Sequence, residues 1–379
     1  MTNIKIIIII IIIIILLIHI PRICIDTKTL ISSNNYDVIH GEDMYHKHID
    51  INNNKSRIIS WTYFEMSNYD WEIYIQKFKK QSINLIRNEL SVINNIQDNK
   101  IIIENTDDNI LNYDVQHNYA INICINNRLK IIKTVYNHQF CGGYFFTRYS
   151  AILGDGIPPI LPTVPIITPF VVELSMLRMV YNKYYNSVYK KYTLVKSSKN
   201  INRLFYTLEK KNKKVGCSTK VWILWTLITA VMKTDTQRKG LDIMIPIAFN
   251  KLKNINNNIG VIFIKYKRGE SIQTLEDNIN NQKHQAISTN YYLRSSFTNG
   301  YKEGKQIRNN VDIVYTSSYI KKNKIKIVRH LTTFTDIADY GIYCFSATTG
   351  DTANVTITLN IQSLDINTLL LNIPNSQLL

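Results

Sequence analysis

The sequence predicts a mixed α/β protein with two half-domains, preceded by an N-terminal hydrophobic helix. Strand and helix patterns alternate along the chain, but without the regular β-α-β repeat of a doubly wound sheet. No Gly-rich phosphate loop follows a predicted strand, which argues against a nucleotide-binding α/β fold. The chain has 379 residues, of which 45% are hydrophobic and 19% charged. This length and composition suit a globular protein of one large or two ordinary domains.

The N-terminus carries an apolar run from residue 6 to residue 20 that only His19 interrupts. A helix of about 15 residues rises roughly 22 Å, which is shorter than the roughly 30 Å hydrocarbon core of a bilayer. No small-residue cleavage site follows the run. We therefore predict a retained signal-anchor, or alternatively a cleaved signal peptide, over residues 1–22 and a polar linker over 23–56. The protein is then membrane-associated, or enters the secretory pathway if the segment is cleaved.

The N-terminal half-domain is predicted over residues 57–195. Apolar residues spaced by three and four from Trp71 onward indicate a helix, whereas alternation on both sides of a polar turn indicates a hairpin. Prolines between 157 and 170 exclude a regular helix there. The predicted elements are a strand over 58–64, a helix over 71–93, a strand over 100–103, hairpin strands over 119–125 and 129–136, a helix opening at Gly142–Gly143, an extended connector over 157–170 and a helix over 171–192.

The C-terminal half-domain is predicted over residues 196–379. Ser218 or Thr219 is placed to cap a strongly apolar helix, and Ser271 to cap a polar one. Short apolar runs between polar segments predict buried strands. The predicted elements are strands over 203–208, 241–249, 260–265, 311–315, 325–328, 342–345 and 355–361, with helices over 221–232 and 271–285.

The chain is strongly basic, with a formal net charge of +17. Its lysines occur in short scattered clusters, none of which lies among aromatic residues on a predicted binding strand. We therefore expect solvated loops and no nucleic-acid partner, although the charge suits a phosphate-bearing ligand or an anionic membrane. The five cysteines are widely spaced without a C-x-x-C pair, so neither a disulfide framework nor a metal site is predicted. No bound cofactor is predicted either.

One stretch, Val-Tyr-Asn-His-Gln-Phe-Cys-Gly-Gly over residues 135–143, combines features of a catalytic site. His138 directly follows a mostly apolar strand, whose end fixes the backbone. It precedes the glycine pair Gly142–Gly143 and a new helix. Glycines permit close approach of a substrate or a neighbouring helix. A histidine in this position is a candidate general base.

The same stretch resembles, with two changes, the His-His-x-x-x-Asp-Gly signature of the chloramphenicol acetyltransferase-like superfamily. That superfamily includes the condensation domains, the wax ester synthase/diacylglycerol acyltransferases and the plant acyltransferases. His138 falls on the second, catalytic histidine, whereas Asn137 replaces the first and Gly142 replaces the aspartate. Later segments, such as Cys217-Ser218-Thr219 before an apolar helix, resemble the superfamily at the level of pattern. The resemblance covers the chain from about residue 57 to its end.

The resemblance implies two similar half-domains with a tunnel between them and the histidine midway along it. His138 would take the proton from an acceptor alcohol or amine as that group attacks an acyl-CoA thioester. A threonine hydroxyl, for which we select Thr333 over Thr332, would stabilise the oxyanion. The aspartate that Gly142 replaces shapes the loop through a salt bridge in the family, so the loop of this chain lacks that device. The resulting hypothesis is a membrane-associated, CoA-dependent O-acyltransferase.

Two alternatives remain open from the sequence. The first is a catalytically inactive protein of the same fold with a binding or structural role, which the glycine at position 142 favours. The second is a secreted or surface binding protein with a C-terminal immunoglobulin-like domain, because residues 336–344 resemble a tyrosine corner. In that case His138 is an ordinary histidine at a strand end.

Overall fold

The structure is a computed structural model. It describes residues 57–90, 101–106, 110, 121–137, 143–157, 202–210, 216–248, 259–288, 311–320, 325–334, 341–349, 351–359, 361, 364–374 and 376–378. The predicted N-terminal helix, the linker, His138, Gly142, the proline-rich connector and the helix expected over 171–192 all lie outside these ranges. Within the ranges, no helix has both the length and the hydrophobicity needed to cross a membrane.

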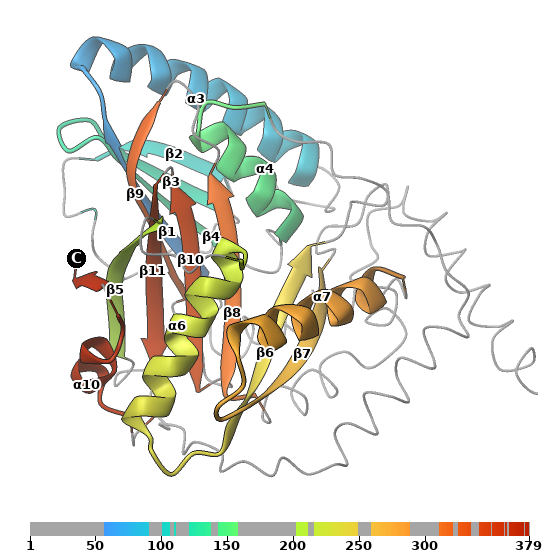
Figure 1. The fold of residues 1–379 in the computed structure, drawn as a ribbon. Coiled ribbons are helices and arrows are strands. Elements are labelled where there is room, and N and C mark those ends of the chain that lie inside the picture. The colour runs from blue at the N-terminus through green and yellow to red at the C-terminus, as the bar shows by residue number, and fades with distance from the viewer. Residues whose placement is uncertain are drawn as a thin grey trace, which may run out of the picture.

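The N-terminal lobe is a five-stranded sheet with helices over one face (Figure 1). Its elements are β1 (Arg57–Glu65), α3 (Asn68–Leu90), β2 (Ile101–Asn105), β3 (Ile121–Asn126), β4 (Ile131–Asn137), α4 (Gly143–Leu153) and, from much later in the chain, β9 (Lys326–Phe334). The strand order is β2-β3-β4-β1-β9, in which only β2 and β3 are parallel. α3 and α4 pack their apolar residues against the same face of this sheet.

The C-terminal lobe is a seven-stranded mixed sheet in the order β12-β5-β11-β10-β8-β6-β7. Its strands are β5 (Asn202–Glu209), β6 (Gly240–Ala248), β7 (Ile259–Lys267), β8 (Ile313–Ile320), β10 (Ile342–Thr349), β11 (Thr352–Leu359) and β12 (Ser376–Leu378). Its helices are α6 (Thr219–Thr234), α7 (Ile272–Ser288) and α10 (Ile366–Leu371). β8 runs parallel to both β10 and β6, and the other pairs are antiparallel.

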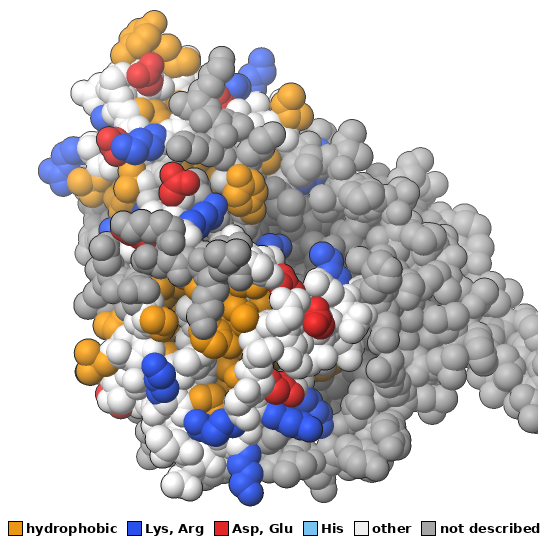
Figure 2. Space-filling model, viewed as in Figure 1, with side chains coloured by type: hydrophobic (Ala, Val, Ile, Leu, Met, Phe, Trp, Pro, Cys, Tyr) orange, Lys and Arg blue, Asp and Glu red, His pale blue; other side chains and the backbone are white. Residues whose placement is uncertain are grey.

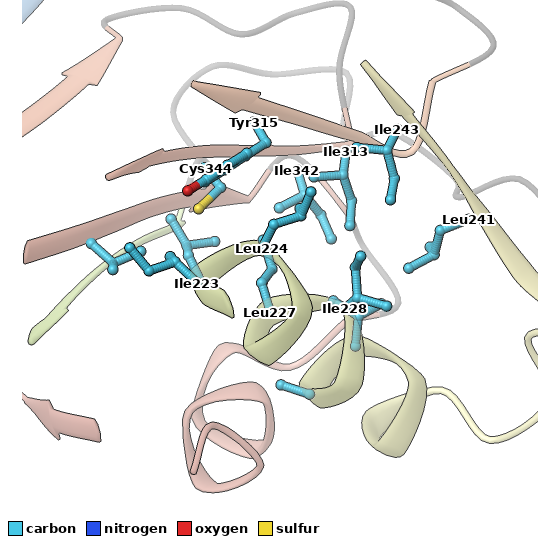
Figure 3. Packing of buried hydrophobic residues seen from close by; sticks show 14 of the residues in the cluster. Ile223, Leu224, Leu227, Ile228, Leu241, Ile243, Ile313, Tyr315, Ile342 and Cys344 are labelled. Atoms are coloured by element: carbon cyan, nitrogen blue, oxygen red, sulfur yellow. The ribbon is translucent and has the colours of Figure 1, made fainter. Parts of the chain in front are cut away.

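Helix α6 forms the centre of the larger core, lying across one face of the seven-stranded sheet (Figure 3). Ser218 caps the helix, because its hydroxyl accepts a hydrogen bond from the Val221 backbone N–H, as the sequence predicts. Leu227 and Ile228 are completely buried against strand residues. Burial of each such side chain contributes roughly 1.5–3 kcal/mol, which makes this contact the main apolar support of the lobe.

Strand β9 connects the two lobes. It follows β8 in the chain but pairs antiparallel with β1 of the N-terminal sheet, with Phe334 opposite Ile58 and His330 opposite Thr62. The same strand contacts β10 and β11 of the C-terminal sheet. Because its side chains alternate, those on one face approach β11 and those on the other approach β10. One strand therefore fixes the relative position of the two sheets at their junction.

The predicted mixed α/β class with two lobes is confirmed. The predicted strand over 325–328 extends to Phe334, and the one over 311–315 extends to Ile320. Helix α10 and strand β12 were not predicted, because six and three residues are too short to show a period. The immunoglobulin-like alternative is wrong. β10 pairs in parallel with β8 in a sheet covered by α6, whereas an immunoglobulin domain packs two antiparallel sheets.

Candidate functional site

The structure describes both ends of the connection that carries the predicted base. The chain leaves β4 at Asn137, which pairs with Arg57, and enters α4 at Gly143. α4 then contacts β8 and β6 of the C-terminal lobe. His138 and Gly142 lie outside the described residues, so their roles stay predictions. The structure shows that this connection begins at the end of an N-terminal-lobe strand and leads into a helix packed against the other lobe.

On the face that α6 does not cover, the C-terminal sheet carries a second buried and largely apolar cluster, here called the wall. On β10, Tyr343 and Phe345 belong to this wall, whereas Ile342 and Cys344, which alternate with them along the strand, belong to the α6 core. The wall consists of Met244, Val311, Val314, Tyr343, Phe345 and Ala347, with Phe263 and Phe334 packed against it. The six side chains of the wall itself are all buried, with at most 8% of their surface exposed.

A hydroxyl pair lies within this wall. The Tyr343 hydroxyl is 2.8 Å from the Thr316 Oγ1, and either oxygen can donate the hydrogen bond. The Tyr343 ring packs edge-on against Phe334 with ring centroids 4.3 Å apart. Phe334 pairs with Ile58, which pairs with Tyr136 one residue before the end of β4. The hydroxyl pair therefore lies at the end of the N-terminal sheet where the His138 connection begins.

Thr333, the predicted oxyanion group, lies in a different setting. Its side chain is completely buried, and its Oγ1 accepts a hydrogen bond from the Arg203 Nε at 3.3 Å. A second hydrogen bond, at 3.1 Å, joins it to the Thr358 Oγ1 of β11. The strand register places it two residues along and two strands across from Asn137, roughly 12 Å away by standard spacings. The structure thus places Thr333 in the contact between lobes and does not bring it to Asn137.

Thr332, the other threonine considered, points to the opposite face of β9 and contacts a buried histidine. Its Oγ1 lies 3.2 Å from the His330 Nε2, and the Thr62 Oγ1 lies 2.8 Å from the His330 Nδ1. Burial lowers the pKa of His330 to about 3, because the charged imidazolium is poorly solvated there. His330 is therefore neutral at physiological pH, with both ring nitrogens hydrogen-bonded to hydroxyls.

No pattern in the sequence singles out three of the residues described above, namely Arg203, His330 and Tyr343. Arg203 donates from Nη2 to the Phe334 carbonyl oxygen at 3.2 Å as well as to Thr333, and so joins β5 to the end of β9. In the sequence it is one polar residue of an alternating strand, which suggests solvent exposure. The pairing of β9 with β1, which spans more than 260 positions of the sequence (Thr62 to His330), creates these environments, and periodicity gives no sign of it.

Exposed basic side chains gather at the end of the C-terminal lobe where α6 ends, β6 begins and β7 ends (Figure 2). Lys233, Lys239 and Lys267 are exposed there. In Figures 1 and 2 this group is well separated from α4. It therefore adds to the basic charge of the surface at a distance from α4. No group of three or more potential metal ligands occurs among the described side chains.

Solved structures with the same two-lobed fold include a condensation domain and an acyltransferase. The starter condensation domain of rhizomide synthetase RzmA, as a double mutant in complex with C8-CoA and Leu-SNAC, has a TM-score of 0.55 at 7% sequence identity, covering 88% of this chain and 91% of that one. The wax ester synthase/diacylglycerol acyltransferase from Marinobacter aquaeolei VT8 has a TM-score of 0.50 at 10% identity, covering 88% and 97%. These likenesses confirm the predicted fold, and at such identities they concern the fold alone.

Comparisons of sequence give no further relative. No protein-family model matches the chain, and no curated protein matches it in sequence.

Proposed function

We propose that this chain, which has the fold of condensation domains and wax ester synthases, transfers an acyl group from acyl-CoA to an alcohol or amine. The observation that carries the proposal is the position of β4 and α4, the described elements on either side of the His138 connection. That connection starts at the end of β4 and enters α4, which packs against β8 and β6. α4 thus reaches the contact between the two lobes, and we place the acyl chain there, beside the buried apolar side chains of the wall.

In the proposed reaction, His138 accepts the proton of the acceptor hydroxyl or amine as the acceptor oxygen or nitrogen attacks the thioester carbonyl carbon. The carbonyl oxygen becomes an oxyanion. The carbon–sulfur bond then breaks, and the histidine returns the proton to the CoA sulfur. The products are the ester or amide and free CoA. Hydrogen-bond donors facing the oxyanion lower the barrier by a few kcal/mol.

We propose an indirect role for Thr333 in this scheme. Its hydroxyl is completely buried and already hydrogen-bonded to Arg203 and Thr358. It is therefore suited to hold β9 against β5 and β11. In this role Thr333 affects the reaction indirectly. It stabilises the position of β9, and so the end of the N-terminal sheet from which the His138 connection starts.

Membrane association through residues 1–22 completes the proposal and rests on the hydrophobic run alone. An anchor would bring the enzyme to lipid acceptors, and the basic surface suits anionic lipids or the phosphates of CoA.

The test is acyl transfer by the full-length protein in detergent, with a panel of acyl-CoAs of increasing chain length and with alcohol and amine acceptors. Free CoA and the acylated product are quantified by chromatography beside a His138→Ala variant. Equal amounts of CoA and product, both lost in the variant, would support the proposal. If the folded wild-type protein and His138→Ala both release no CoA, the protein is not an acyltransferase of this mechanism.

The second candidate is an inactive protein of the same fold that binds a ligand, which Gly142 in place of the signature aspartate favours. Binding of acyl-CoA without turnover, measured by calorimetry on the same preparation, would identify it. Restoring the carboxylate with Gly142→Asp gives a further comparison. A gain of turnover would show that only the loop-shaping device had been lost.

A further inference from the structure

The C-terminal lobe contributes an aromatic hydroxyl to the side of the interlobe contact that α4 approaches. Tyr343 lies on β10 in the wall that faces away from α6, and α4 contacts β8 and β6 of the same sheet. Its neighbours in the wall include Met244, Val314 and Phe345, so the hydroxyl is a polar group in apolar surroundings. Such placed polar groups orient ligands in apolar sites.

The orientation of this hydroxyl is fixed on both sides. Phe334 packs edge-on against the ring at 4.3 Å between centroids, and Thr316 forms the 2.8 Å hydrogen bond with the oxygen. Tyr343 pairs with Val314 on β8, so Thr316 is its diagonal neighbour on the same face. A phenol can accept from a threonine hydroxyl and donate its own proton at the same time. A donor held by its neighbours needs no reorganisation when charge develops.

Tyr343 and Thr333 are both buried, but the hydrogen-bond partner of Tyr343 lies nearer the surface. The side chain of Thr333 is 0% exposed, whereas Tyr343 keeps 6% of its surface and Thr316 is half-buried. Strand pairing also shows which end of β4 Tyr343 lies near. Its ring contacts Phe334, which lies opposite Ile58 on β1. Ile58 in turn lies opposite Tyr136, near the end of β4. Of these two hydroxyls, that of Tyr343 is therefore the better placed to meet a substrate beside the end of β4.

We infer that Tyr343 is a catalytic residue, which donates a hydrogen bond to the thioester carbonyl oxygen while Thr316 orients its hydroxyl. This inference rests on the proposed acyl transfer. No bond to Tyr343 forms or breaks, since the hydroxyl stabilises the negative charge on the oxygen as the acceptor attacks. Thr316 is a positioning residue, because it acts through the tyrosine.

The chain offers a matched control in Tyr315, the tyrosine on the opposite face of the same sheet. The Tyr315 hydroxyl is hydrogen-bonded to the Lys220 carbonyl oxygen at 3.0 Å and to the Ser346 Oγ at 2.9 Å, within the α6 core (Figure 3). Tyr315→Phe therefore removes a buried phenolic hydroxyl without touching the proposed site. Tyr343→Phe keeps the ring that packs on Phe334.

The experiment compares kcat, KM and melting temperature of the full-length wild type with those of Tyr343→Phe, Thr316→Val and Tyr315→Phe. We expect Tyr343→Phe to lower kcat about 10²-fold, the scale of losing an oxyanion donor, with KM for acyl-CoA changed less than about threefold. Thr316→Val should lower kcat by a smaller factor. Tyr315→Phe should keep wild-type kcat even where it lowers the melting temperature. Wild-type kcat in Tyr343→Phe, or equal kcat losses in both tyrosine variants, would overturn the inference.

The two proposals fail in different ways. Turnover that depends on His138 but not on Tyr343 leaves acyl transfer standing and removes the role of Tyr343. If the wild type shows no turnover, calorimetry with an acyl-CoA decides whether Tyr343 contacts this ligand. A binding constant weakened about fivefold or more in Tyr343→Phe, but not in Tyr315→Phe, would keep Tyr343 as a ligand contact. An unchanged constant, or no binding at all, would remove that role.

Discussion

Arg238 and Asp312 form an ion pair that is almost completely buried in the C-terminal lobe. The Arg238 Nη1 lies 3.3 Å from the Asp312 Oδ1, and both side chains are only 1% exposed. The Asp312 Oδ2 also accepts a hydrogen bond from the Asp242 backbone N–H at 2.8 Å. The turn after α6, the start of β6 and the residue before β8 are thereby held together. Arg268, in the turn directly after β7, reinforces this junction by donating to the Arg238 carbonyl oxygen at 2.7 Å.

Removing one partner of this pair should be strongly destabilising. Asp312→Ala leaves the Arg238 guanidinium buried beside the partly exposed Asp235 carboxylate, without the buried counter-charge. Breaking a buried pair in this way typically costs about 3–5 kcal/mol. Urea unfolding followed by far-UV circular dichroism would measure the change in the free energy of unfolding.

The matched control is the exposed pair between Lys326 and Glu65, whose side chains are 65% and 62% exposed. Lys326→Ala should change the free energy of unfolding by no more than about 1 kcal/mol, because solvent screens such a pair. Similar losses in Asp312→Ala and Lys326→Ala would show that burial does not set the strength of the inner pair.

His330 should make stability depend on pH. Its folded-state pKa is lowered to about 3, below the value near 6.5 expected when the chain is unfolded. The unfolded chain therefore binds more protons between these two values. The contribution of the neutral histidine to stability is fully present above about pH 6.5 and is lost as the pH falls below it, by up to about 1.4 kcal/mol per pH unit.

The measurement is the free energy of unfolding between pH 7 and pH 5 for the wild type and for His330→Gln, which keeps polar atoms near Thr62 and Thr332. The variant should be less stable at pH 7 but show a shallower pH dependence. The prediction fails if the two slopes agree, since the imidazole would then not be the group that titrates.

Most helices and strands could be predicted from the sequence, because an element that buries one face shows a regular spacing of apolar residues. The helix over 221–232 and its Ser218 cap follow from local residue types, because apolar periodicity and a side-chain hydroxyl at the first turn are both local signals. The pairing of β9 with β1 could not be predicted. Strand pairing depends on contacts between distant segments, and neither segment's own sequence shows its partner.

The candidate site was predicted less completely. The proposed chemistry of His138 and the order of strand, connection and helix follow from the motif. The residues that the C-terminal lobe places near them do not. Alternation along residues 342–349 shows no difference between the α6 side and the interlobe side of β10, since both faces are buried. Tyr343 and Cys344 therefore look equally internal in the sequence. Only the tertiary packing separates them, because Cys344 lies in the α6 core and Tyr343 in the wall.

The core of the C-terminal lobe should respond to truncation at Leu227. This side chain is completely buried between α6 and the sheet, and Leu227→Ala creates a cavity that close packing does not readily fill. We expect a loss of about 2–5 kcal/mol in the free energy of unfolding, measured in urea. Leu371, which is 85% exposed at the end of α10, is the control. Leu371→Ala should cost less than about 0.5 kcal/mol, and an equal loss at both positions would contradict the assigned core.

Arg203 and Thr333 should behave as one unit in a double-mutant cycle. Arg203→Met removes two hydrogen bonds, to the Thr333 hydroxyl and to the Phe334 carbonyl oxygen, whereas Thr333→Val removes only the hydroxyl and its contacts. Because the side chains share one hydrogen bond, the double variant should lose less stability than the sum of the single losses. A coupling of about 0.5–3 kcal/mol is typical of residues in direct contact.

Arg329 provides the comparison, since its guanidinium carbon lies 5.3 Å from the centroid of the Tyr63 ring on the same pair of strands. A cation–π contact at a partly exposed position contributes about 1 kcal/mol or less, so Arg329→Met should show no coupling to Thr333→Val. The same variants address function. If Thr333 acts by holding β9 in place, Thr333→Val and Arg203→Met should lower kcat by similar factors. A much larger loss in Thr333→Val alone would instead assign its hydroxyl to the substrate.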